Sequence, residues 1–259
     1  MTRFASRLAE GRAFIPFFML GDPDPPTSLR LLTAAVEAGA DALELGIPFS
    51  DPIADGPTIQ RAAQRALAAG VRPAGALEVA SEVRRRFPQL PLGLLVYANL
   101  VAAAGRPRFY GRVADAGVDA VLVADVPVRE GASYAAAAVE AGVDPVFIAA
   151  PNTPESALAR LAELGRGFTY CVARPGVTGA GHELRLPPER VLADLARVSA
   201  PPAVIGFGIS EPEHVQAAFA AGAAGAISGS AVVQRVEAHL DDPRAAERAV
   251  GDFVARMRR

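Results

Sequence analysis

Three carboxylates lie close together in the sequence, and their surroundings suit acid–base chemistry. Glu44 stands in an apolar run, where the two-residue period of a strand places Leu43 and Leu45 on one face and Glu44 on the other. If the leucines pack against helices, Glu44 points into the protein interior. Burial of a carboxyl group raises its pKa towards neutrality, where the group can both give and take protons. A structural glutamate held by an arginine is the alternative.

The other two carboxylates, Asp51 and Asp55, lie between three prolines in the loop 47–57. This loop is more apolar than an ordinary solvent loop and has the composition of a shaped wall beside a site. Either aspartate could instead cap a turn or a helix, because Asp-Pro and Asp-Gly pairs are common turn signals. The residue types alone leave both interpretations open.

Glycine-rich segments indicate where a ligand could bind. The segment 174–181 has the glycine content of a loop that closes over a substrate. The segments 206–208 and 229–230 each end a predicted strand, the second just before a helical pattern. Glycines let backbone N–H groups approach an anion, and a helix N-terminus adds a favourable dipole. These two short segments predict a phosphate site, with tight backbone packing as the alternative.

The types of basic residue and the spacing of the histidines exclude several reaction mechanisms. All 26 basic residues are arginine, so a Schiff-base aldolase and an internally bound pyridoxal phosphate are both excluded. The three histidines, His182, His214 and His239, lack the spacing of metal ligands, and we expect no protein-bound metal. What remains is acid–base catalysis by carboxylates near a phosphate. That chemistry serves either a proton-shuffling isomerase or a carbon–carbon cleavage in which the substrate supplies its own electron sink.

Composition excludes several other classes of protein. With a net charge of -2 and a pI near 6.0, the chain offers no basic face for nucleic acid. No apolar run approaches the ~20 residues that span a bilayer, and nothing resembles a secretion signal, so we expect a cytoplasmic protein. A single cysteine, Cys171, allows no intrachain disulfide.

A recurring unit indicates the architecture that positions these residues. A helical stretch ends in Ala-Gly, two small residues follow, and an apolar run begins, as at residues 38–41, 116–119 and 141–144. Each copy marks a helix-to-strand joint. Eight strands alternating with helices predict a single (β/α)8 TIM barrel over residues 1–259, with extra short helices and its active site at the C-terminal strand ends. A doubly wound open sheet is the alternative. The predicted strands are 13–20, 41–47, 91–98, 120–126, 145–150, 168–173, 203–208 and 224–229.

Residues 43–60, which read LELGIPFSDPIADGPTIQ, closely resemble the signature of the tryptophan synthase α-subunit family. Further similar segments cover essentially the whole chain. By this resemblance Glu44, Asp55 and Tyr170 match catalytic residues, and Thr178 lies in the loop that closes against Asp55. The residues that match the wall of the family's indole pocket are Phe17, Ile59, Leu95, Tyr97 and Phe207. Those that match its phosphate site are Gly179, Gly208, Gly229 and Ser230.

The resemblance implies cleavage of indole-3-glycerol phosphate into indole and glyceraldehyde 3-phosphate, a step of tryptophan biosynthesis. In this interpretation Glu44 protonates C3 of the indole and helps to deprotonate the glycerol hydroxyl. Asp55 accepts the indole N–H and stabilises its developing positive charge. The chain itself needs no metal or cofactor. Pyridoxal phosphate is expected in a partner β subunit, which receives the indole within an α2β2 heterotetramer.

Three other functions remain open at this point. A stand-alone lyase would perform the same cleavage and release free indole. A weakly active regulatory subunit would mainly bind and activate a β chain, although the presence of both Glu44 and Asp55 argues against it. A sugar-phosphate isomerase on the same barrel would share the phosphate site but has no need of the apolar pocket.

Overall fold

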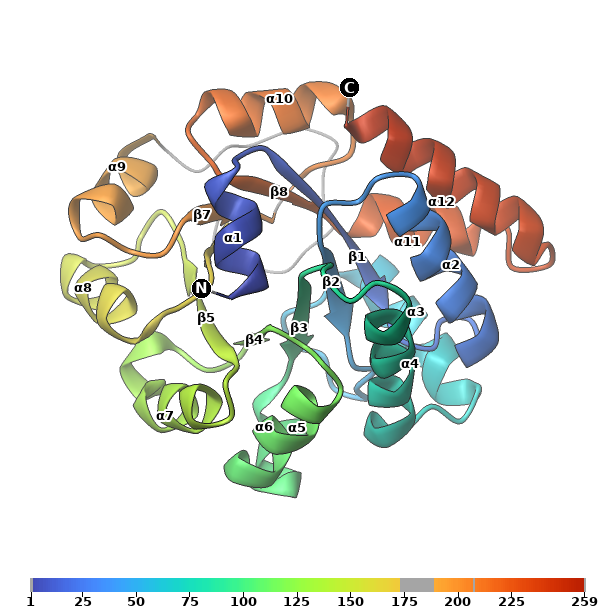
Figure 1. Ribbon diagram of the computed structural model, residues 1–259, viewed down its shortest axis with the longest axis horizontal. Helices are drawn as coiled ribbons and strands as arrows, with labels where there is room; N and C mark the ends of the chain where they lie inside the picture. Colours follow the sequence, from blue (N-terminus) through green and yellow to red (C-terminus); the bar gives the residue numbers. More distant parts are fainter. Residues whose placement is uncertain (1, 173–188, 207, 259) are drawn as a thin grey trace.

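A computed structural model describes residues 2–172, 189–206 and 208–258. In these residues eight parallel strands pair in chain order, and β8 pairs with β1 to close a barrel (Figure 1). The predicted TIM barrel is confirmed, and each strand begins within two residues of its predicted start. The strands are β1 (Ala13–Met19), β2 (Leu43–Gly46), β3 (Leu92–Val96), β4 (Ala120–Val123), β5 (Asp144–Ala149), β6 (Thr169–Cys171), β7 (Ala203–Ile205) and β8 (Gly225–Ser228).

Helices surround the strands, and α12 packs beside α2 on the outside of the barrel (Figure 1). Within the described ranges, no helix combines the length and apolar character needed to cross a membrane. The helices are α1 (Arg3–Ala9), α2 (Pro25–Glu37), α3 (Pro57–Ala68), α4 (Pro73–Arg86), α5 (Ala98–Ala104), α6 (Arg106–Asp115), η1 (Val128–Glu130), α7 (Ala132–Glu140), α8 (Glu155–Leu164), α9 (Glu189–Arg197), α10 (Pro212–Ala220), α11 (Ser230–Glu237) and α12 (Pro243–Met257).

The strand register decides which side chains enter the barrel. Phe17 pairs with Glu44, and Glu44 pairs with Gly93, so these three residues share one face of the sheet. Following the register around the closed sheet places Tyr170 of β6 on the same face. Strands β2 and β6 lie on opposite sides of the barrel, yet the charge of Glu44 acts on Tyr170. The shared face is therefore the interior.

Helix α1 covers the base of the barrel, the end at which the strands begin (Figure 1). Its buried side chains Phe4 and Leu8 pack against strand positions that carry no side chain. A Cβ added at Gly93 would lie 3.3 Å from the Phe4 ring, and one at Gly225 would lie 3.3 Å from Leu8. Phe4 also contacts Phe168, with 5.0 Å between the ring centroids. The base is thus filled by apolar side chains.

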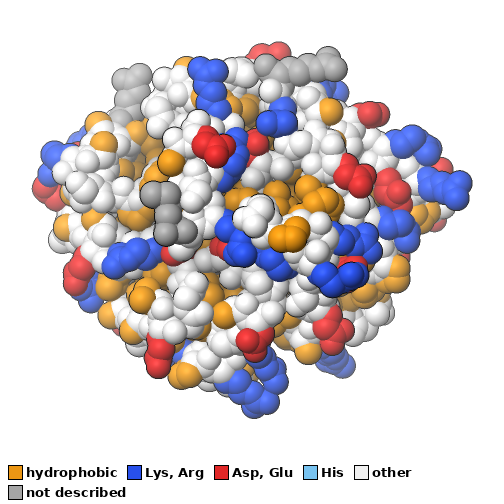
Figure 2. All heavy atoms as spheres, viewed as in Figure 1, with side chains coloured by type: hydrophobic (Ala, Val, Ile, Leu, Met, Phe, Trp, Pro, Cys, Tyr) orange, Lys and Arg blue, Asp and Glu red, His pale blue; other side chains and the backbone are white. Residues whose placement is uncertain are grey.

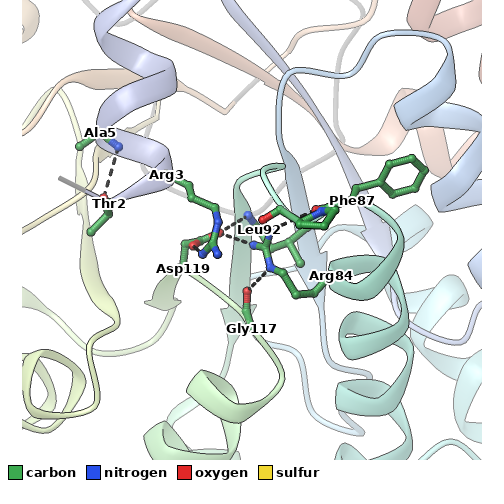
Figure 3. A network of polar contacts seen from close by, with 9 residues as sticks. Thr2, Arg3, Ala5, Arg84, Phe87, Leu92, Gly117 and Asp119 are labelled. Atoms are coloured by element: carbon green, nitrogen blue, oxygen red, sulfur yellow. Dashed lines mark hydrogen bonds and ion pairs between the residues drawn. The ribbon is translucent and has the colours of Figure 1, made fainter.

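A polar network secures the same end of the barrel (Figure 3). The buried carboxylate of Asp119 accepts hydrogen bonds from Arg3 of α1, Arg84 of α4 and the backbone N–H of Leu92, at 2.7, 2.7 and 2.8 Å. Figure 2 views this end and shows basic side chains gathered around its middle. Helix α1, helix α4 and strand β3 are held together by one carboxylate. The opposite end, where the strands finish, is left for a site.

Candidate active site

Glu44 lies on the inner face of β2 and is only 3% exposed. Burial raises the pKa of Glu44 to about 8, and the nearby charge of Asp55 adds to the rise. Among the described residues no arginine forms an ion pair with this carboxylate, so the structure gives no support to the arginine-paired alternative. The side chain holds its proton at neutral pH, which a general acid requires.

Asp55 lies in the loop between β2 and α3 and is 7% exposed. Its backbone N–H donates to the Pro52 carbonyl at 3.0 Å, and its carbonyl accepts from the Gln60 side chain at 2.8 Å. The N-cap of α3 is Gly56, so Asp55 does not cap that helix. Its carboxylate instead accepts a hydrogen bond from the Tyr97 hydroxyl.

Two opposing effects set the pKa of Asp55. Burial raises the pKa of Asp55 to about 6, although the hydrogen bond from Tyr97 favours the ionised carboxylate. Asp51 in the same loop is exposed and hydrogen-bonds with the Ser50 hydroxyl. Of the two loop aspartates, only Asp55 interacts with Glu44 and Tyr170 in the barrel interior. At pH 7 the pair therefore consists of a protonated glutamate and an ionised aspartate.

Tyr170 and Phe17 extend over the interior because two glycines make room for their rings. The Tyr170 hydroxyl donates to the Gly206 carbonyl at 3.1 Å, and a Cβ at Gly206 would lie 2.1 Å from the ring. A Cβ at Gly46 would lie 2.8 Å from the Phe17 ring. Gly46 was not predicted to belong to the site. Its position directly after Glu44 and Leu45 on an inward-facing strand was the available signal.

The expected indole-pocket residues come from neighbouring elements. Leu95 is half-buried on the inner face of β3, where it pairs with Gly46. Ile59 is buried in the first turn of α3, and Tyr97 is buried directly after β3. The Tyr97 ring stacks on Phe49, with 5.4 Å between centroids and 27° between planes. These apolar walls lie beside the carboxylate pair and suit a flat aromatic ring. Phe207, also expected here, lies outside the described residues.

The expected phosphate residues lie where β7 and β8 finish. Gly208 has a φ of 74°, which favours glycine, and Ser230 is the first residue of α11 after the N-cap Gly229. The buried Ser228 hydroxyl donates to the Ile209 carbonyl at 2.7 Å, which ties the end of β8 to the loop after β7. This contact was not predicted from the sequence. Thr178, Gly179 and the predicted closing loop 174–181 lie outside the described residues.

The contacts described around Gly229 give no support to tight packing as the reason for a glycine there. An added Cβ would meet only Phe17, at 3.9 Å, so the surrounding chain that the structure describes does not require glycine for packing. Its φ of -101° does not require glycine either. The described residues leave space beside the N-terminus of α11, and a helix N-terminus is a place where anions can bind.

The histidines have local roles in the described part of the chain. His214 accepts from the Ser210 backbone N–H at 3.3 Å, and the His239 ring hydrogen-bonds with the Arg235 carbonyl at 2.9 Å. Neither belongs to a group of three or more metal-ligating side chains, and the described residues contain no such group. Among the described residues, the two carboxylates and the tyrosine hydroxyls are the groups at the strand ends that could take part in acid–base chemistry.

Comparisons with known proteins show which family the chain resembles. A family model described as tryptophan synthase alpha chain matches residues 4–259. The chain is 52% identical over 256 residues to the tryptophan synthase alpha chain of Shewanella oneidensis, covering 98% of this chain and 92% of the relative. It is 53% identical over 263 residues to the tryptophan synthase alpha chain of Aeromonas hydrophila, covering 100% of this chain and 98% of the relative. A chain of the tryptophan synthase α2β2 complex from Pyrococcus furiosus matches with a TM-score of 0.86 at 35% identity, covering 95% and 98%.

Proposed function

Because the chain belongs to the tryptophan synthase alpha chain family, we propose that Glu44 and Asp55 are the two carboxylates with which it cleaves indole-3-glycerol phosphate. The enzyme is a lyase of tryptophan biosynthesis that forms indole and glyceraldehyde 3-phosphate. One observation carries the assignment of residues. Glu44 of β2 and Asp55 of the loop after β2 interact, and burial raises the pKa of Glu44 to about 8 and that of Asp55 to about 6. That pairing supplies both an acid and a negative charge.

The reaction follows from these two protonation states. Glu44 delivers its proton to C3 of the indole, and the ring becomes a cationic electron sink. Asp55 accepts the indole N–H and stabilises the positive charge that develops on the ring. Glu44, now ionised, takes the proton of the hydroxyl on the carbon attached to C3. The carbon–carbon bond breaks, its electrons return to the ring to give indole, and the hydroxyl carbon becomes the aldehyde of glyceraldehyde 3-phosphate.

Tyr170 is the third residue that we assign to catalysis. Its hydroxyl is fixed by the Gly206 carbonyl, and its ring lies across the interior within the fields of Glu44 and Asp55. Burial raises the pKa of Tyr170 well above its ordinary value, and both carboxylates add to the rise, so the hydroxyl stays neutral. A neutral phenol beside the pair can orient the substrate without competing for its proton.

We assign the phosphate to the loops after β7 and β8, where Gly208, Gly229 and Ser230 lie. Gly229→Asp is expected to weaken binding of glycerol 3-phosphate about tenfold or more, because a carboxylate would repel the anion at close range. The fold should survive, since among the described residues a Cβ there meets nothing nearer than 3.9 Å. Calorimetric titration checks the affinity. Gly229→Ala is the matched control, and equal affinity in both variants would remove this assignment.

The chain is the α subunit of a tryptophan synthase assembly, as in the α2β2 complex from Pyrococcus furiosus. Pyridoxal phosphate belongs to the β subunit. We propose that the α reaction itself uses no cofactor, because protonated indole already accepts the bonding electrons. The chain also has no lysine with which to hold pyridoxal phosphate as a Schiff base.

Indole release by the purified chain tests the function directly. We expect slow release from indole-3-glycerol phosphate by the chain alone and much faster release after a tryptophan synthase β subunit is added. Equally fast release with and without the β subunit would instead describe a stand-alone lyase. Absence of release in both assays would contradict the proposed reaction.

A further inference from the structure

The hydroxyl of Tyr97 reaches the catalytic loop rather than only lining a pocket. It accepts a hydrogen bond from the Ala54 backbone N–H at 3.2 Å, across 43 positions of sequence. A hydroxyl that accepts from a backbone N–H keeps its own proton to donate. That proton goes to the neighbouring Asp55 carboxylate. One phenol oxygen therefore contacts both the backbone and the side chain of the loop.

Tyr97 is itself held firmly. It is buried and occupies the N-cap position of α5, and its carbonyl accepts from the Leu100 N–H at 3.0 Å. The next residue, Ala98, donates its N–H to the Asp125 carboxylate at 2.7 Å. Phe49, from the catalytic loop, stacks on the Tyr97 ring. The Tyr97 hydroxyl is therefore held in place at the end of β3, and the catalytic loop packs against the Tyr97 ring.

The groups that face Asp55 explain why this donor matters. In the described part of the chain they are Glu44 from β2, Tyr97 from the end of β3 and Tyr170 from β6. None of these three is a cation, so none offsets the effect of burial by opposite charge. A hydrogen bond donated to a carboxylate favours its ionised form. The Tyr97 hydroxyl supplies that bond.

We propose that Tyr97 is a positioning residue, whose hydroxyl keeps the Asp55 carboxylate ionised and directed towards the indole N–H. The proposal rests on the role of Asp55 given under Proposed function. It differs from a role in the pocket wall, because a wall requires only the aromatic ring. A positioning role requires the hydroxyl.

Tyr97→Phe separates the two roles, since it keeps the ring that stacks on Phe49 and removes only the oxygen. We expect kcat at neutral pH to fall about tenfold, as befits loss of a hydrogen bond to a charged group, with little change in KM. The acid limb of the pH–rate profile should move up by about one pH unit, because Asp55 loses the bond that favours its charge. Tyr110→Phe, which removes a buried phenol hydroxyl far from the pair, should leave the profile unchanged.

A second replacement, expected to shift the acid limb in the opposite direction, strengthens the test. Site-specific replacement of Tyr97 by a fluorinated tyrosine gives a more acidic and therefore stronger donor. We expect it to move the acid limb to lower pH, opposite to Tyr97→Phe. A role in packing alone predicts no such reversal. Acid limbs that coincide in the native enzyme and both variants would overturn the proposal.

A readout independent of turnover keeps this proposal apart from the proposed function. Carboxyl-carbon NMR of the full-length chain, with the Asp55 signal identified by its loss in Asp55→Asn, reports the ionisation of Asp55 directly. The signal should titrate at higher pH in Tyr97→Phe than in the native chain. An unchanged titration overturns the positioning role even if Asp55 is essential. Near-normal turnover of Asp55→Asn would instead overturn the catalytic role of Asp55, whatever Tyr97 does.

Discussion

Glu44→Gln is expected to abolish indole release, with a fall in kcat of about 10³-fold or more. An amide can neither deliver a proton to C3 of the indole nor take one from the hydroxyl, and general acid–base groups typically contribute factors of this size. Glutamine has the same shape as glutamate, so its side chain fits the same place inside the barrel. Steady-state measurement of indole release checks the activity.

The same substitution should change how stability depends on pH. The pKa of Glu44 is raised from 4.5 in the unfolded chain to about 8 in the folded protein. Between these values the folded state retains a proton that the unfolded state has lost. The Glu44 contribution therefore becomes less favourable to folding as pH rises, by about 1.4 kcal/mol per pH unit. Glu44→Gln removes this slope, so the variant should gain stability relative to the native chain as pH rises towards 8.

Denaturant unfolding of both proteins across this pH range measures the difference. Glu78→Gln, on the exposed face of α4, is the matched control and should leave turnover unchanged. Near-normal turnover of Glu44→Gln would contradict the assignment of the general acid. Parallel stability curves would show that Glu44 is ionised in the folded protein at neutral pH.

The barrel could be predicted because its signals are local and repeated. The Ala-Gly joints end α2, α6 and α7, where glycines adopt positive φ just before a buried strand. The inward direction of Glu44 also follows from two-residue alternation, since its flanking leucines mark the outer face. Both features depend on residues only a few positions apart. Local sequence therefore decides them.

Features that depend on distant contacts could not be predicted in the same way. Helix α1 is too short to be stable alone, and it is held by packing on Gly93 and by Asp119, which lies 116 positions from Arg3. Its signals were Thr2, which caps the helix, and the four-residue spacing of Phe4 and Leu8. The ends of the strands also extend less far than apolar composition indicates, because the chain turns into the site loops there.

The electrostatic interaction between Glu44 and Asp55 also depends on tertiary structure. Sequence alone left Asp51 and Asp55 equivalent, since both lie in one apolar loop beside proline or glycine. The Tyr97 hydroxyl and the barrel interior distinguish them, and neither is visible from spacing. The resemblance to a known family pointed to Asp55 rather than Asp51. The contacts of the Asp55 carboxylate offer a physical reason for that choice.

Asp55→Asn is expected to lower kcat by about 10²- to 10³-fold, the usual effect of removing one group that stabilises transition-state charge. The amide oxygen can still accept the indole N–H, but it cannot offset the positive charge on the protonated ring. Asp51→Asn is the matched control in the same loop, and its exposed side chain should leave turnover unchanged. Comparable losses in both variants would show that the loop, not the Asp55 charge, matters.

The pH dependence makes the roles of the two carboxylates separable. Native kcat/KM should rise with an apparent pKa of about 6 as Asp55 ionises, and fall with one of about 8 as Glu44 loses its proton. In Asp55→Asn the acid limb should disappear. The basic limb should move to lower pH, because the charge of Asp55 is one cause of the raised pKa of Glu44. If Asp55→Asn kept the acid limb, that ionisation would belong to another group. Loss of the acid limb together with displacement of the basic limb requires that Asp55 and Glu44 act as a coupled pair.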